Sequence, residues 1–142
     1  MKPSYTFLEH TADVLFQASA PTINELFEQC ALAVEDTQVD IALVQPAIAQ
    51  KITLKNKTLE RLLFDFLEEL VFYKDSELLV FSQFKVKVQQ KGGEYNLVCQ
   101  AEGDKLSHQK HDPKVDVKAV TMHLFQIKKI TGGWQAQVLL DI

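Results

Sequence analysis

The chain has 142 residues, of which 46% are hydrophobic, and its formal net charge at pH 7 is −4. This length supports one hydrophobic core and is too short for two ordinary domains, so we expect a single domain over residues 1–142. The negative charge and a single arginine, Arg61, argue against a protein that holds phosphates through its own overall field, so no stable direct binding to nucleic acid is expected.

Two short strands and a helix are predicted in the first part of the chain. Residues 5–10 and 14–19 are rich in aromatic and aliphatic side chains, and a break at Thr11-Ala12-Asp13 separates them. Thr22 and Glu25 have the spacing of a capping box. Apolar residues then recur every three or four positions from residue 23 to residue 34, which predicts an amphipathic helix.

A strand, a second helix and a hairpin are predicted next. The strand covers about residues 48–54, where apolar side chains alternate with polar ones. The hairpin pairs residues 84–88 with residues 95–101 around a turn at Gly92-Gly93. Between them lies the strongest helical pattern of the chain, made by Leu59, Leu62, Leu63, Phe66, Leu67, Leu70 and Val71.

The last third contains a polar segment and a final hairpin. Residues 103–114 hold His108 and His111 and are predicted to form an exposed, solvated loop. Strands at about 117–130 and 134–140 then pair through a glycine turn. Strands and helices in this order predict an α+β domain, with two amphipathic helices packed on a mostly antiparallel β-sheet.

Cellular context is constrained by the apolar segments and the cysteines. No apolar run approaches the ~20 residues that cross a bilayer, and the first residues lack the apolar stretch of a secretory signal. We therefore expect a soluble, cytoplasmic protein without membrane contact. Cys30 and Cys99 fall at apolar positions of a predicted helix and strand, so we expect them to be core residues.

The chain ends in two adjacent carboxylates. A strand-like run ends in Asp141 and Ile142, so the last side-chain carboxylate lies beside the terminal carboxylate, and both are negatively charged at neutral pH. Hard oxygen donors of this kind suit a divalent cation such as Mg²⁺ or Ca²⁺. An ordinary solvated terminus is the alternative. A further carboxylate elsewhere in the chain would favour a metal site.

His10 and Asp13 flank the break between the first two predicted strands. An irregular backbone there can direct both side chains into one site, and an Asx-type turn without a functional role is an equal alternative. Lys118 and His123 are five residues apart and would face opposite sides of a regular strand, so a joint role for them requires a bulge. No signature of a serine hydrolase, nucleotide-binding loop or zinc site occurs in the chain.

Several short segments stand out along the chain. In order, they are His10-Thr11-Ala12-Asp13, the helical Leu67-Glu68-Glu69-Leu70, His111-Asp112-Pro113, Val117 to His123 and the ending Leu140-Asp141-Ile142. Together they resemble the archease family over essentially the whole chain. The sequence departs from the family at Met122, where a tyrosine is usual, and near residues 19–21, where a glycine is common. Neither departure removes a carboxylate.

The resemblance implies a non-catalytic accessory protein for an RtcB-type RNA ligase in tRNA splicing or RNA repair. Such a protein promotes guanylylation of the ligase and its repeated turnover, and GTP is used by the ligase rather than held by this chain. Carried over by position, a divalent metal site would comprise Asp13, Asp141 and Ile142, with Ca²⁺ or Mg²⁺ as the ion and Mn²⁺ as a further candidate. His10, Lys118 and His123 would lie around the metal or contact the partner.

Two other functions remain open from the sequence. The first is a stand-alone metal-dependent hydrolase, in which Asp13 and Asp141 hold the ion and His10 or His123 acts as general base. The second is a chaperone-like or scaffold module that uses exposed apolar surface and needs no metal. An assay of the purified chain alone with phosphoesters distinguishes the first, and metal-independent stimulation of a ligase would favour the second.

Overall fold

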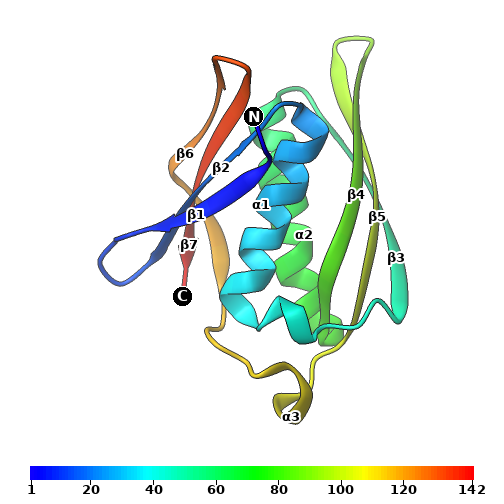
Figure 1. Ribbon diagram of the computed structural model, residues 1–142. Helices are drawn as coiled ribbons and strands as arrows, with labels where there is room; N and C mark the ends of the chain where they lie inside the picture. The colour runs from blue at the N-terminus through cyan, green and yellow to red at the C-terminus, as the bar shows by residue number, and fades with distance from the viewer.

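The computed structural model describes residues 1–142, and its strands form two antiparallel sheets (Figure 1). The first sheet has the strand order β1-β2-β7-β6, and the second has the order β3-β5-β4. The elements are β1 (Ser4–Leu8), β2 (Val14–Ala20), α1 (Ile23–Gln38), a 3-10 turn η1 (Ile41–Leu43), β3 (Ile48–Asn56), α2 (Leu59–Glu77), β4 (Leu79–Lys91), β5 (Glu94–Lys105), α3 (His108–His111), β6 (Ala119–Ile130) and β7 (Gly133–Asp141).

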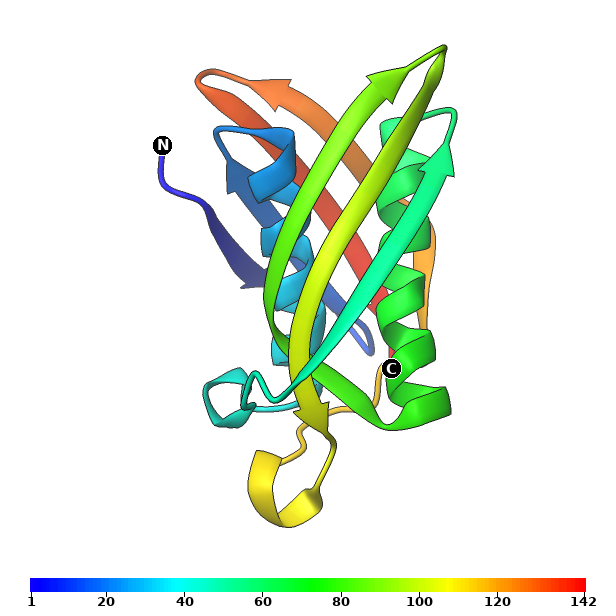
Figure 2. The same cartoon turned by 90° about the vertical axis from the view of Figure 1, so that its right-hand side faces the viewer.

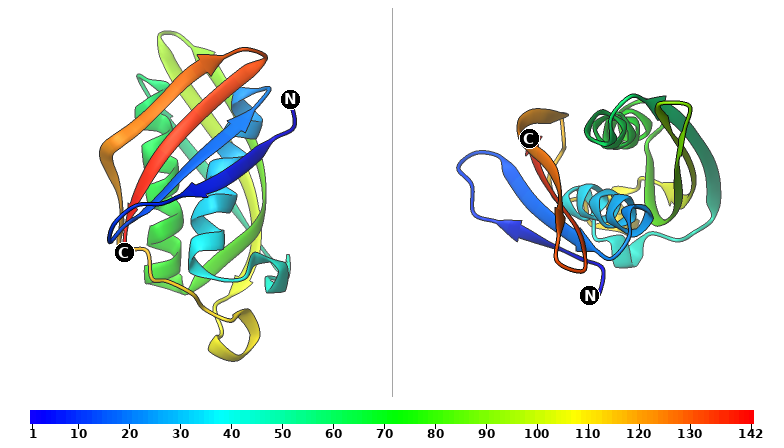
Figure 3. Two further views of the ribbon diagram at one scale, coloured as in Figure 1. Left: turned by 60° about the vertical axis from the view of Figure 1, so that its left-hand side comes forward. Right: turned by 90° about the horizontal axis from the view of Figure 1, so that it is seen from above.

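The two long helices form the middle layer of the molecule. Seen from above, α1 and α2 lie between the two sheets (Figure 3), and each helix contacts strands of both sheets. Phe27 of α1 stacks on Phe66 of α2 with ring centroids 6.2 Å apart, and Phe66 meets Phe84 of β4 edge-on. One core cluster of 27 buried residues therefore spans all three layers.

Local sequence signals set the helix boundaries. The Thr22 and Thr58 hydroxyls accept hydrogen bonds from the Glu25 and Arg61 amides and so cap the N-termini of α1 and α2. Leu78 ends α2 in the left-handed region at φ 53°, and its amide returns to the carbonyl of Lys74. The predicted helices are confirmed, and each extends beyond its predicted end.

The α+β class and the two amphipathic helices are confirmed, and every predicted strand is present. Both helices are apolar on more than one side. The strands therefore divide between two sheets, and each helix packs against both of them. Cys30 and Cys99 are buried and free, as expected. No helix is long and apolar enough to cross a membrane.

The segment 103–114 differs from its prediction as an exposed loop. β5 extends to Lys105, and the single turn α3 follows. The His111 side chain is fully buried: its Nδ1 accepts the Ser107 amide at 3.0 Å, and its carbonyl accepts the Asp40 amide. The solvated position predicted for His111 is therefore wrong. The segment turns inward, and the His111 ring accepts the hydrogen bond of the Ser107 amide inside the fold. His108 is exposed, as predicted.

A bulge in β4 is stabilised by a buried carboxyl group. The register of β4 against β5 shifts between Phe81 and Gln83. The Phe81 amide donates to Glu35 Oε2 of α1 at 2.8 Å. Opposite the bulge, a Cβ at Gly103 would lie only 1.8 Å from the Val80 carbonyl oxygen, so glycine permits this close strand crossing. Glu35 thus holds the sheet to the helix layer.

Candidate functional site

Asp13 and Asp141 come together at the ends of two neighbouring strands. β2 begins at Val14, directly after Asp13, and β7 ends at Asp141. These strands are antiparallel, and their register pairs Val14 with Leu140. Asp13 is in the bend one residue before β2, and Asp141 is the last residue of β7, so the two residues lie at the same end of this strand pair. Two residues 128 positions apart in the sequence thereby share one edge of the sheet.

The end of β7 is held from both sides. β7 lies between β2 and β6, and Ala119 of β6 pairs with Asp141. The Lys118 amide donates to the Asp141 carbonyl at 2.8 Å. Ile142 is half-buried, and its side chain packs against the core cluster. The last backbone atoms are therefore fixed next to the Asp141 carboxylate.

The turn before β2 carries His10 and Asp13. His10 Nδ1 lies 3.9 Å from Asp13 Oδ2, a distance suited to charge attraction but too long for a hydrogen bond, and both side chains are about one-third exposed. Ala12 between them adopts a left-handed conformation at φ 67°. Such a conformation is rare for a residue with a Cβ and is found at tightly determined turns.

The donor set fits a divalent cation that takes oxygen ligands. Neither Asp13 nor Asp141 forms an ion pair with a lysine or arginine. Carboxylate oxygens are the ligands that Ca²⁺ and Mg²⁺ prefer. No three His, Cys, Asp or Glu side chains gather closely enough to hold a metal. Side chains of this kind therefore supply at most two charged oxygen donors here.

Lys118 and His123 are placed differently with respect to this edge. Lys118 contacts Asp141 through its backbone. His123 is exposed and lies in the irregular stretch of β6 between Thr121 and Gln126, where pairing with β7 lapses. The bulge that a joint role of Lys118 and His123 would require is therefore present. His123 forms no ion pair with either carboxylate.

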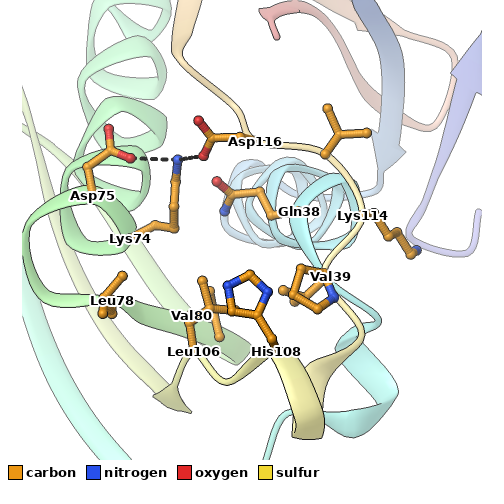
Figure 4. Close-up of a pocket in the computed structure, with 12 residues that line it drawn as sticks. Gln38, Val39, Lys74, Asp75, Leu78, Val80, Leu106, His108, Lys114 and Asp116 are labelled. Carbon is orange, nitrogen blue, oxygen red and sulfur yellow. Dashed lines mark hydrogen bonds and ion pairs between the residues drawn. The ribbon is translucent and has the colours of Figure 1, made fainter.

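A second polar cluster, which sequence analysis missed, lies at the C-terminal end of α2, beside the segment that leads into β6. Lys74 is buried, and its ammonium group contacts Asp75 Oδ1 at 2.6 Å, Asp116 Oδ1 and the Val117 carbonyl (Figure 4). These acceptors use all three protons of the ammonium group. Burial alone would lower the pKa of Lys74, but the bonds to Asp116 and Asp75 outweigh it and raise that pKa. The cluster pins the segment before β6 to α2.

A cavity of about 420 Å³ adjoins this cluster. Its walls are largely apolar, and Gln38 Oε1 is buried there without a hydrogen-bond partner. Lys74 could have been found from the sequence, because it continues the apolar stripe of α2 one turn beyond Leu70. Glu35 likewise follows directly on the apolar stripe of α1.

The fold of this chain is shared with a protein of known class. The same α+β architecture occurs in a crystal structure of an archease from Thermotoga maritima, described as a possible chaperone. That structure has a TM-score of 0.63 and 18% identity, and the match covers 95% of this chain and 94% of that one. This degree of likeness establishes an archease-type fold.

The chain belongs to the archease family. The model of the Archease protein family (MTH1598/TM1083) matches residues 5–142. Protein archease of Pyrococcus furiosus is 42% identical over 135 residues, which cover 94% of this chain and 95% of that protein. The solution structure of Protein 1598 of Methanobacterium thermoautotrophicum has a TM-score of 0.87 at 35% identity and covers 97% of this chain and 98% of that one. The resemblance seen in the sequence is confirmed.

Proposed function

We propose that this archease is an activating factor for an RtcB-type RNA ligase in tRNA splicing or RNA repair, and that it is not itself an enzyme. Membership of the family supports the ligase as partner. The observation that carries the proposal is the pair of carboxylates Asp13 and Asp141 at one end of the paired strands β2 and β7, with neither carboxylate paired to a lysine or arginine.

The metal site of the proposal comprises Asp13, Asp141 and the terminal carboxylate of Ile142. A bound Ca²⁺, Mg²⁺ or Mn²⁺ would supply positive charge to which phosphate oxygens are attracted. The chain's own part is positioning: β2 and β7 fix the two aspartates, the Lys118 amide fixes the Asp141 backbone, and the packed Ile142 side chain fixes the last residue. His10 lies close enough to Asp13 to orient its carboxylate.

The experiment that tests this function is a reconstitution of ligase guanylylation. Purified ligase, GTP and a divalent ion are incubated with and without this protein, and incorporation of labelled GMP into the ligase is measured. We expect the protein to increase both the rate of guanylylation and the number of RNA joining events per ligase. Equal guanylylation with and without the protein would refute the proposal.

Extending the chain beyond Ile142 provides a second test. A short Gly-Ser extension converts the terminal carboxylate into an amide and moves the new carboxylate away. We expect calorimetry to show roughly 100-fold weaker binding of the divalent ion, since one charged oxygen donor is lost. The same extension added before Met1 is the matched control and should leave the affinity unchanged. Equal affinities for the two extended proteins would remove Ile142 from the site.

A stand-alone hydrolase is not favoured by any particular observation. Burial raises the pKa of the Cys30 thiol, and it raises the pKa of Cys99 to about 12, so neither cysteine is a ready nucleophile. The purified chain should therefore leave GTP and simple phosphoesters intact when the ligase is absent. Hydrolysis that disappears on replacement of Asp141 would establish the alternative instead.

A further inference from the structure

Positive charge gathers on the outer face of the sheet β3-β5-β4. Residues alternate along each strand, so apolar side chains such as Ile52 and Cys99 point to the helices and their neighbours point outward. Figure 2 views the molecule from the side of this sheet, with the helices behind it. The outward side chains of β3 and β4 include four exposed lysines, which we name the lysine face: Lys51, Lys55, Lys85 and Lys87.

The strand register fixes the spacing of these lysines. Gln100 of β5 pairs with Lys51 on one side and Lys85 on the other. Because neighbouring strands are about 4.8 Å apart, these two lysines flank Gln100 at a separation of roughly 10 Å. Lys87 follows Lys85 by two residues, about 6.6 Å, on the same strand. The result is a group of cations spread over two strands rather than one long row.

The lysine face forms no ion pair within 4 Å: none of its four lysines takes part in one. One carboxylate lies nearby, because Glu28 of α1 accepts the Val86 amide next to Lys85, and the charge of Lys85 acts to lower the pKa of Glu28. Along the rows that hold these lysines, the outward residues of β5 are neutral: Gln100, Val98 and Asn96. An acidic residue, Glu102, lies one row beyond. The whole chain carries −4, so the positive face and the surplus of negative charge are separated in space.

We propose that the lysine face binds the phosphate backbone of duplex RNA. The choice of RNA rests on the proposed function, in which the partner ligase acts on RNA. Proteins that hold single strands stack bases on aromatic side chains, and the lysine face carries none, whereas a duplex presents densely spaced phosphates to a basic surface. A membrane surface fits poorly, because Val98 is the one large apolar side chain exposed among these lysines.

The lysine face and the Asp13/Asp141 edge belong to different sheets, separated by the helix layer (Figure 3). The acidic edge can therefore meet a ligase while the lysine face holds an RNA stem. This arrangement revises the expectation drawn from net charge. A net charge of −4 excludes strong attraction at long range but not contact through one basic face, and that contact should weaken steeply with salt.

Binding of a fluorescein-labelled RNA hairpin, measured by anisotropy between 20 and 200 mM KCl, tests the proposal. The test variant is Lys51→Gln with Lys55→Gln, Lys85→Gln and Lys87→Gln. The matched control replaces the exposed Lys2, Lys57, Lys105 and Lys128 with glutamine and so has the same net charge. For four phosphate contacts to a duplex the wild-type slope of log affinity against log salt should be about −3.6. The test variant should bind about tenfold or more weakly at low salt, and the control within about threefold of wild type.

Three results would overturn the proposal: no salt-dependent binding by the wild type, equal losses in the two variants, or tighter binding to phosphatidylserine vesicles or polyglutamate than to the hairpin. Thermal unfolding of both variants checks that they are folded. Guanylylation of the ligase needs no RNA, so the test variant should still stimulate it. Loss of RNA binding with retained stimulation thus separates this proposal from the proposed function.

Discussion

Replacing Asp13 or Asp141 with asparagine is expected to reduce stimulation of ligase guanylylation to the level of the ligase alone. Asparagine keeps the shape of the side chain and removes its charge. Changing a residue that merely orients a metal ligand costs 10–100-fold in affinity, so losing a charged ligand should cost roughly 100-fold or more. Incorporation of labelled GMP into the ligase measures stimulation, and calorimetry with the divalent ion measures affinity.

The control for this prediction is Glu60→Gln, which removes an exposed carboxylate from the first turn of α2. It should leave both stimulation and metal affinity unchanged. The fold of all three variants should survive, because the Asp13 side chain is one-third exposed and that of Asp141 is exposed. If the asparagine variants keep their thermal midpoints and still stimulate the ligase fully, the two carboxylates have no role in activation.

Glu35→Gln is expected to stabilise the protein at high pH. Burial raises the pKa of Glu35 from 4.5 to about 8, although the Phe81 amide and the Lys74 charge oppose the shift. Between these two pH values the folded protein holds a proton that the unfolded chain has released, so the free energy of unfolding falls as pH rises from about 4.5 to about 8. The stabilising effect of the raised pKa is complete below this window and lost above it. At about 1.4 kcal/mol per pKa unit, the loss amounts to several kcal/mol.

Glutamine at position 35 keeps an oxygen for the Phe81 amide and cannot ionise. Urea unfolding of wild type and variant at pH 5, 7 and 9 should therefore show a difference in free energy that grows by more than about 2 kcal/mol in favour of the variant. Glu60→Gln, on the exposed face of α2, should show no such growth. Parallel stability curves for Glu35→Gln and wild type would mean that Glu35 is already ionised in the folded protein.

The sequence predicts the elements well because local signals set them. The cap at Thr22, the stripe of α2 and the Gly92-Gly93 turn each act over a few residues, and all are found. Division of the strands between two sheets depends on long-range pairings such as β2 with β7, which no local pattern encodes. The proximity of Asp13 to Asp141 was expected only from family resemblance, and the strand register supplies its physical cause.

Residues whose roles depend on burial were predicted less well. His111 was assigned to solvent because its neighbours are polar, yet its ring accepts a backbone hydrogen bond inside the fold. The separation of charge on the lysine face was also hidden, since net charge sums over the whole surface. The sequence does contain a signal for this face. Lys85 and Lys87 alternate with the apolar Val86, so both lysines lie on the side of the strand that points away from the core.

The position of β7 between β2 and β6 has a consequence for how the acidic edge moves. A central strand is released only when the pairing on both of its sides is lost, whereas edge strands and loops open in small, frequent fluctuations. Leu140 is therefore released only when its pairing to both Val14 and Val120 is lost. Asp141 follows it with pairing to β6 alone, so the carboxylate of Asp141 is carried by a strand that opens rarely except at its last residue.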